Sequence, residues 1–185
     1  MPRRERDPYV IKRPAPLAER IPEGQKGTAQ ITHEADGDKT ITNLLIDGES
    51  VMTDRTTEWL SQLEAFLAQA SGRVLVGGLG LGLIIKPLWR NPAVLSVDIL
   101  EISQDVIDLV WEHVNPGDGK IRLHQADVFS WDPEPLRLKW DQAYFDLSTK
   151  VGDEDFATLT AKYTPFLKEG GEIKRWEPLG GEPQQ

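Results

Sequence analysis

One glycine-rich stretch constrains the fold of this chain more than any other feature. Four glycines fall within six residues, at Gly77, Gly78, Gly80 and Gly82. They follow the apolar run 73–76 and precede a helical stretch and a second apolar run, 94–100, that ends in the acid Glu101. A buried strand, a glycine turn, a helix and a second buried strand form a βαβ unit. The sequence therefore predicts a parallel sheet with helices on its faces.

The glycine turn also predicts a ligand site. Without a Cβ, the backbone can approach a ligand closely, and the following helix offers N–H groups to a carboxylate or phosphate. Glu101 stands where a carboxylate can accept hydrogen bonds from both hydroxyls of a ribose. The spacing from Gly78 is G-x-G-x-G, and the position three after Gly80 is Leu83. This differs from the G-x-G-x-x-G dinucleotide pattern. A glycine-rich turn without any ligand is the alternative.

Composition narrows the class of protein. The 185 residues are enough for one domain, and the hydrophobic fraction of 39% predicts a packed core. There is no cysteine, which excludes disulfides, thiolate metal sites and a cysteine nucleophile. The three histidines, His33, His113 and His124, are far apart and lack metal-ligand spacing. We expect no metal site.

Charge disfavours some partners. The net charge is −9, and residues 1–27 carry seven Lys/Arg against four Asp/Glu, so the acidity lies in the remainder. An acidic body repels nucleic acid and anionic membranes but not an amine or a sulfonium. No apolar run is long enough for a membrane span, and no apolar core follows the N-terminal arginines as in a secretory signal. The expectation is a cytoplasmic protein with no membrane partner. Nucleic acid is disfavoured as a partner, although a local basic patch stays open.

The sequence divides into four segments. Residues 1–27 hold five prolines and predict an extended arm, either a solvated tail or a lid over the site. Residues 28–53 predict a small antiparallel β meander, because Asp-Gly turns separate its β-prone runs. Residues 54–177 form the predicted main domain, and 178–185 a tail. Within the main domain we expect helices over 54–70, 103–114 and 153–163, and further strands over 121–124, 140–145 and 172–176.

Several motifs in order resemble one known family. These are Leu45-Ile46-Asp47-Gly48, the glycine turn with Glu101, Gln125-Ala126-Asp127, Tyr144-Phe145-Asp146-Leu147-Ser148 and Phe166-Leu167-Lys168-Glu169-Gly170-Gly171. Together they resemble the class I S-adenosylmethionine-dependent methyltransferase superfamily, in its spermidine synthase-like branch. The resemblance implies an α/β fold with a Rossmann-like doubly wound sheet. The expected strand order is 3-2-1-4-5, with the family's strands six and seven missing from the C-terminus.

The resemblance also implies roles for seven residues. Gly78, Gly80 and Gly82 would cradle the methionine part and the ribose. Glu101 would hold the ribose hydroxyls, Ile102 would pack on adenine, and Asp127 would receive the adenine amino group. Asp146 would be the catalytic residue, which takes a proton from an attacking amine. The alternative for Asp127 is a turn-capping aspartate.

Three departures weaken the aminopropyl transferase interpretation. The family's second aspartate corresponds to Thr149, its glutamine falls on Val51 or Met52, and its next tyrosine falls near Leu60. Because these residues serve the polyamine side, the nucleoside side is better preserved.

The leading hypothesis is therefore an S-adenosylmethionine-binding transferase, most simply a methyltransferase on a small or amine-bearing acceptor. The alternatives are an aminopropyltransferase that uses decarboxylated S-adenosylmethionine, and a non-catalytic relative that binds a nucleoside or a partner chain. A nicotinamide oxidoreductase ranks fourth because of the glycine spacing. The shortened sheet would leave an unpaired edge strand, which predicts a homo-oligomer or coverage by the N-terminal arm.

Overall fold

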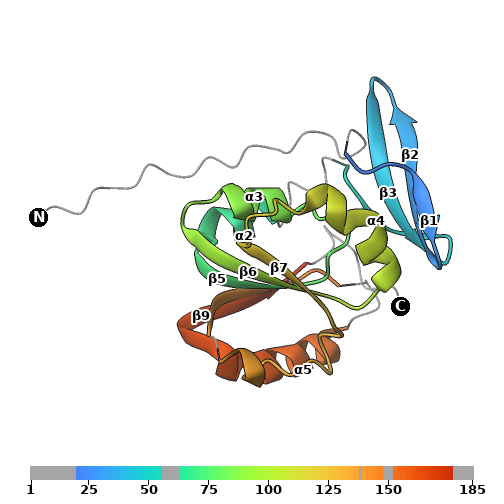
Figure 1. The fold of residues 1–185 in the computed structure, drawn as a ribbon. Helices are drawn as coiled ribbons and strands as arrows, with labels where there is room; N and C mark the ends of the chain where they lie inside the picture. The colour runs from blue at the N-terminus through green and yellow to red at the C-terminus, as the bar shows by residue number, and fades with distance from the viewer. Residues whose placement is uncertain (1–19, 56–62, 138, 148–151, 177–185) are drawn as a thin grey trace, which may run out of the picture.

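A computed structural model describes residues 20–55, 63–137, 139–147 and 152–176. These residues form two sheets, one parallel with five strands and one antiparallel with four (Figure 1). The predicted α/β class is confirmed, and so is the predicted antiparallel unit ahead of the parallel sheet. Most of the N-terminal arm and the C-terminal tail lie outside the described residues.

The parallel sheet is the centre of the molecule. Its strands are β5 (Gly72–Gly77), β6 (Val94–Glu101), β7 (Ile121–Gln125), β8 (Trp140–Phe145) and β9 (Leu167–Arg175). They lie in the order β7-β6-β5-β8-β9, and all four neighbouring pairs run parallel. The order reverses at β5, which has the second strand on one side and the fourth on the other. In an open α/β sheet, this reversal is the usual position of a ligand site.

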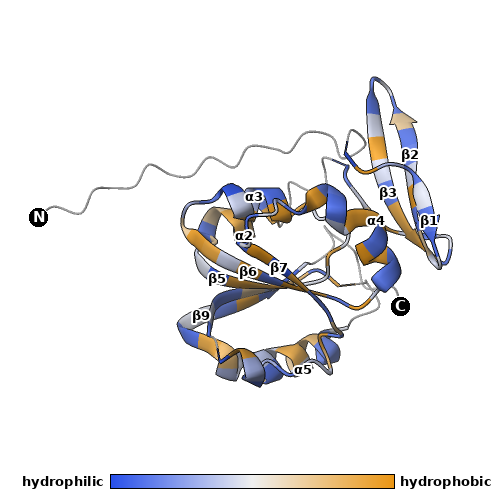
Figure 2. Cartoon of the chain, viewed as in Figure 1, coloured by the Kyte–Doolittle hydropathy of each residue, from blue (hydrophilic) through white to orange (hydrophobic). Residues whose placement is uncertain are grey.

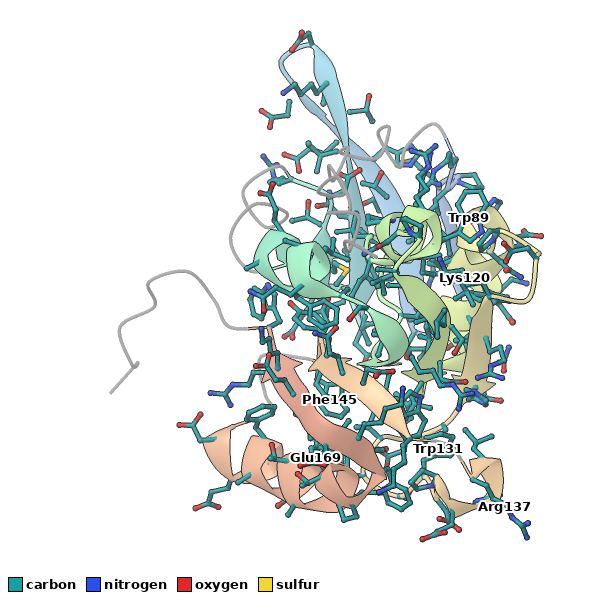
Figure 3. The ribbon with its side chains drawn as sticks, turned by 90° about the vertical axis from the view of Figure 1, so that its left-hand side faces the viewer. Trp89, Lys120, Trp131, Arg137, Phe145 and Glu169 are labelled. Carbon is teal, nitrogen blue, oxygen red and sulfur yellow. The ribbon has the colours of Figure 1, made fainter. Side chains whose placement is uncertain are left out.

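Helices cover both faces of the parallel sheet (Figure 1). The helices α2 (Glu64–Gln69), α3 (Ile85–Arg90) and α4 (Gln104–Val114) share one core with the strands, and α5 (Asp153–Tyr163) covers the opposite face. Short 3-10 turns lie before β8, at Glu134–Leu136, and after α5, at Thr164–Phe166. Hydrophobic residues line the strands and the inner sides of the helices (Figure 2). Phe145 of β8 lies between the sheet and α5, with its ring centroid 5.3 Å from that of Tyr163 (Figure 3).

The antiparallel sheet lies beside α4 (Figure 1). It consists of β1 (Gly24–Lys26), β2 (Ala29–Asp36), β3 (Lys39–Ile46) and β4 (Glu49–Thr53), in chain order. The first strand falls within the range predicted as an arm, so the structure adds a strand to the predicted meander. Ile21, just before it, is fully buried. The backbone N–H of Thr28 donates to the Asp105 carboxylate of α4 at 3.1 Å, which joins the two units.

The helix predicted over residues 54–70 is described only in its last part. Asp54 and Arg55 are not helical, residues 56–62 lie outside the described part, and α2 covers Glu64–Gln69. The carboxylate of Asp54, just after β4, accepts a hydrogen bond from the backbone N–H of Thr42 at 2.7 Å. It therefore binds β3. Ser103 caps the start of α4, because its Oγ accepts a hydrogen bond from the N–H of Val106 at 3.3 Å.

The last strand is longer than expected. β9 covers Leu167–Arg175, whereas the sequence predicted a strand over 172–176. Its pairing with β8 is irregular between Trp140 and Gln142, and Gly170 has a positive φ of 77°, so the added first part of the strand is interrupted. Within the described residues β9 pairs with β8 alone. Its side chains include lysines and glutamates, which natural proteins use to protect edge strands. Coverage by another subunit or the arm stays a prediction.

The described residues contain neither a membrane-spanning helix nor a cluster of metal-ligand side chains. No helix there is long and apolar enough to cross a membrane. Nor does that part of the chain contain a group of three or more His, Cys, Asp or Glu residues that could hold a metal ion.

Candidate functional site

The predicted site residues follow four neighbouring strands at one end of the parallel sheet. Gly78 follows β5, Glu101 ends β6, Asp127 comes two residues after β7, and Asp146 follows β8. The backbone N–H of Gly78 donates to Leu100 O at 2.8 Å, and that of Asp146 donates to Gly77 O at 2.8 Å. The sheet therefore brings the glycine turn, Glu101 and Asp146 to one edge, at the reversal of strand order.

The carboxylate of Glu101 lies directly against the glycine turn. Its Oε2 accepts a hydrogen bond from the backbone N–H of Leu79, and its Oε1 accepts one from the N–H of Ser103, both at 2.8 Å. Only 8% of the residue is exposed. A carboxylate has about four lone-pair positions, so each oxygen keeps room for a further donor. The two backbone bonds hold Glu101 in a single orientation at the end of β6.

The three glycines of the predicted cradle have different neighbours. A Cβ on Gly78, at φ 98°, would collide with the backbone oxygen of Asp146. A Cβ on Gly80 would collide with the side chain of Met52, and one on Gly82 would press on Val114 of α4. The absence of side chains therefore lets the turn pack against Asp146 just after β8, against β4 and against α4 of its own chain. The cradling of a ligand by these glycines stays a prediction.

Met52 is the neighbour that sequence reasoning missed. It was noted only as one of two positions where the family has glutamine. In the structure its Sδ accepts a hydrogen bond from the backbone N–H of Leu81 at 3.1 Å. The contact joins β4 of the antiparallel sheet to the glycine turn, which stand far apart in sequence. No local pattern around residue 52 signals such a contact.

Two large apolar side chains remain exposed near the site. Ile102, next to Glu101, is 66% exposed, and Phe129, after β7, is 40% exposed. Both follow carboxyl ends of the parallel strands. An exposed isoleucine beside a predicted ribose-binding acid agrees with the adenine-packing role implied for it, but no contact in the structure tests that role.

The structure gives Asp127 a turn-capping contact. Its Oδ1 accepts from the N–H of Phe129 at 2.9 Å, and its backbone oxygen accepts from Ser130 and Trp131. This is the geometry of the alternative that the sequence left open. Only one carboxylate oxygen is used in that turn, so the adenine role stays a prediction.

Asp146 lies close to a buried tyrosine. The hydroxyl of Tyr144, two residues earlier on β8, is buried and has no hydrogen-bond partner among the described residues. Burial raises the pKa of Tyr144, and the negative charge of Asp146 raises it further. The phenol is therefore neutral at physiological pH and can only act as a donor or acceptor of hydrogen bonds. Thr149, where the family has its second aspartate, lies outside the described residues.

Comparisons with known proteins relate the fold to solved structures. A spermidine synthase from Thermotoga maritima aligns with a TM-score of 0.54 at 17% identity, over 82% of this chain and 55% of that one. A spermidine synthase solved with the transition-state analogue AdoDATO aligns with a TM-score of 0.56 at 18% identity, over 82% and 56% of the two chains. This chain thus spans little more than half the length of either enzyme.

A weaker likeness extends to a methyltransferase. CcbJ from Streptomyces caelestis aligns with a TM-score of 0.47 at 21% identity, over 60% of this chain and 44% of that one. No protein-family model and no curated protein matches the sequence. At these identities the comparisons show a shared fold, and the chain has the Rossmann-like architecture seen in spermidine synthases.

Proposed function

We propose that this protein is an S-adenosylmethionine-binding transferase, most simply a methyltransferase on a small or amine-bearing acceptor. The observation that carries the proposal is the position of Glu101. Its carboxylate is held against the glycine turn by Leu79 and Ser103, at the carboxyl ends of β5 and β6. An open α/β sheet binds nucleosides at this position, and a carboxylate here can accept hydrogen bonds from the two ribose hydroxyls.

The chemistry of such a site depends on placement. Methyl transfer from a sulfonium needs the acceptor atom in line with the sulfur–carbon bond, which is a positioning effect. Asp146 follows β8 beside Gly78 and carries a carboxylate suited to taking a proton from an amine. The acidic net charge of −9 favours cationic acceptors over anionic ones.

An aminopropyltransferase that uses decarboxylated S-adenosylmethionine is the second candidate. It is favoured by the extent of the fold likeness, because the alignments with the spermidine synthases cover 82% of this chain. The departures at Val51 and Thr149 weigh against it. The choice between the two candidates depends on which form of the cofactor binds.

Calorimetry with four ligands tests the proposal. We expect heat with S-adenosylmethionine and with methylthioadenosine, and none with NAD, because the glycine spacing differs from the dinucleotide pattern. A preference for decarboxylated S-adenosylmethionine over S-adenosylmethionine would favour the aminopropyltransferase. Absence of heat with every adenosyl ligand would contradict both candidates and leave a partner-binding protein.

Replacing Glu101 with glutamine is expected to weaken adenosyl ligand binding at least tenfold, about 1.4 kcal/mol. The substitution keeps the size of the side chain but removes the charge that would strengthen two hydrogen bonds to the ribose. It also turns an NH2 group toward one of the two backbone N–H groups that the carboxylate accepts from. The measurement is the dissociation constant by calorimetry. Glu112→Gln is the matched control, since the Glu112 side chain is 75% exposed on α4 and should leave affinity unchanged. Equal affinities in the wild type and Glu101→Gln would refute the ribose assignment.

A further inference from the structure

The glycine turn is covered by a side chain of its own protein. Met52 comes from β4 of the antiparallel sheet, and its Sδ lies 3.1 Å from the backbone nitrogen of Leu81. The side chain occupies the face of Gly80 that a Cβ would otherwise fill. Gly80 has a φ of 48°, in the left-handed region that favours glycine. The close approach that this glycine permits is therefore made by Met52.

Met52 also occupies one of the backbone hydrogen-bond donors of the turn. The N–H groups of Gly78 and Gly82 donate to backbone oxygens, and that of Leu79 donates to Glu101. The N–H of Leu81 donates to the Met52 sulfur. A thioether is a weak acceptor, whereas the other three partners are oxygens. Of these four N–H groups, that of Leu81 has the weakest acceptor, so a ligand oxygen can most easily replace its partner.

We infer that Met52 is a specificity-determining residue that competes with the amino-acid tail of the cofactor. The inference rests on the proposed function, in which the glycine turn receives the methionine part of S-adenosylmethionine. The tail carboxylate would need a hydrogen bond from the Leu81 N–H, which now donates to Met52. It would also need the space beside Gly80 that the Met52 side chain fills. A nucleoside that ends in a 5′-methylthio group needs neither. Met52 therefore lowers the affinity for tail-bearing ligands and leaves that for tail-less nucleosides unchanged.

Displacing the Met52 side chain from the glycine turn is unfavourable because the side chain packs against the hydrophobic core. The side chain is half-buried and packs against the core cluster that lies between the parallel sheet, α2, α3 and α4. Moving it exposes apolar surface to water, which opposes tail binding. A tail carboxylate also enters beside Glu101, whose charge repels it. Both effects act on the tail and spare the nucleoside.

Two substitutions at one position test the inference in opposite directions. Met52→Ala empties the face of Gly80, so we expect S-adenosylmethionine to bind about fivefold tighter or more. Met52→Gln offers an amide oxygen, a stronger acceptor for the Leu81 N–H, so we expect weaker binding of S-adenosylmethionine. Methylthioadenosine should bind all forms within about twofold, since it has no tail. Val51→Ala is the matched control, because Val51 precedes Met52 on the same strand and is 48% exposed.

The readout is the ratio of the two dissociation constants, measured by calorimetry on the full chain. Circular dichroism melts confirm that each variant is folded. If Met52→Ala fails to fold, Met52→Gln alone still decides by its opposite shift. A ratio equal in all variants, with both ligands bound, overturns this inference and leaves the proposed function standing. Absence of heat with either ligand in the wild type and in both variants overturns the proposed function itself.

Discussion

Replacing Asp98 with asparagine is expected to lower the free energy of unfolding by about 3 kcal/mol. Asp98 lies in the middle of β6 and is fully buried. Its two oxygens accept four hydrogen bonds, from Arg122 Nε and Nη2, His124 Nε2 and Trp140 Nε1, at 2.9–3.0 Å. An asparagine has one acceptor oxygen and would point its own N–H groups at these donors. The loss is large because the indole N–H of Trp140 is buried with no other partner in the described structure.

The same carboxylate predicts a pH dependence. Burial raises the pKa of Asp98, but hydrogen bonds from His124, Trp140 and Arg122 lower it by more, so the pKa lies below its ordinary value. A group with a lowered pKa in the folded state stabilises the protein above its unfolded pKa, about 3.9 for aspartate. That stability is lost as the pH falls through the folded pKa. We therefore expect the wild type to lose stability below about pH 4, and Asp98→Asn to lose less over that range.

Urea unfolding at neutral and acidic pH measures both effects. Asp153→Asn is the matched control, since Asp153 pairs with Arg175 while its own side chain is 90% exposed. An exposed ion pair contributes at most about 1 kcal/mol. Trp131 packs against the network, with its ring centroid 5.4 Å from that of His124 (Figure 3). If Asp98→Asn costs no more than the control, the carboxylate is not the centre of this network.

Replacing Gly78 with alanine is also expected to lower the free energy of unfolding by about 3 kcal/mol. Two causes add. A left-handed φ costs an L-residue about 1–2 kcal/mol, and Gly78 has φ 98°. The new methyl group would also meet the backbone oxygen of Asp146, which cannot rotate away as a side chain would. Overpacking of this kind costs about 1–3 kcal/mol.

Gly37→Ala separates the two causes. Gly37 has φ 65°, also in the left-handed region, but a Cβ there has nothing within 4 Å. Its substitution should therefore lower the free energy of unfolding only by the backbone strain of the left-handed φ. Thermal or urea unfolding of both variants gives the difference directly. Equal losses at positions 37 and 78 would mean that β8 does not pack against the turn as described.

Much of the architecture follows from local patterns. The predicted strand 140–145 and helix 153–163 match β8 and α5 residue for residue. A continuous apolar run predicts a buried strand well, and helical spacing of apolar residues predicts a packed helix. The Asp-Gly turns similarly place β3 and β4, because such turns determine where a hairpin reverses.

Long-range contacts are what local patterns leave out. The carboxylate of Asp54 accepts a hydrogen bond from Thr42, twelve residues away, and no local pattern signals that contact. Met52 looks like an ordinary strand residue, and its contact with Leu81 depends on how the two sheets pack. The network around Asp98 joins three strands, so only the sheet register brings its members together. For the same reason, the ribose role of Glu101 could be proposed from sequence, but its bond to Leu79 could not.

The most direct test of the nucleoside site is a titration of the ¹⁵N-labelled protein with methylthioadenosine, followed by amide chemical shifts. We expect the largest shifts at the amides of the glycine turn and of Glu101, Ile102 and Ser103. The amides of β9, at the edge of the sheet, should be unaffected. Shifts confined to other surfaces, or no shifts at millimolar ligand, would contradict the assignment of this turn as an adenosyl site.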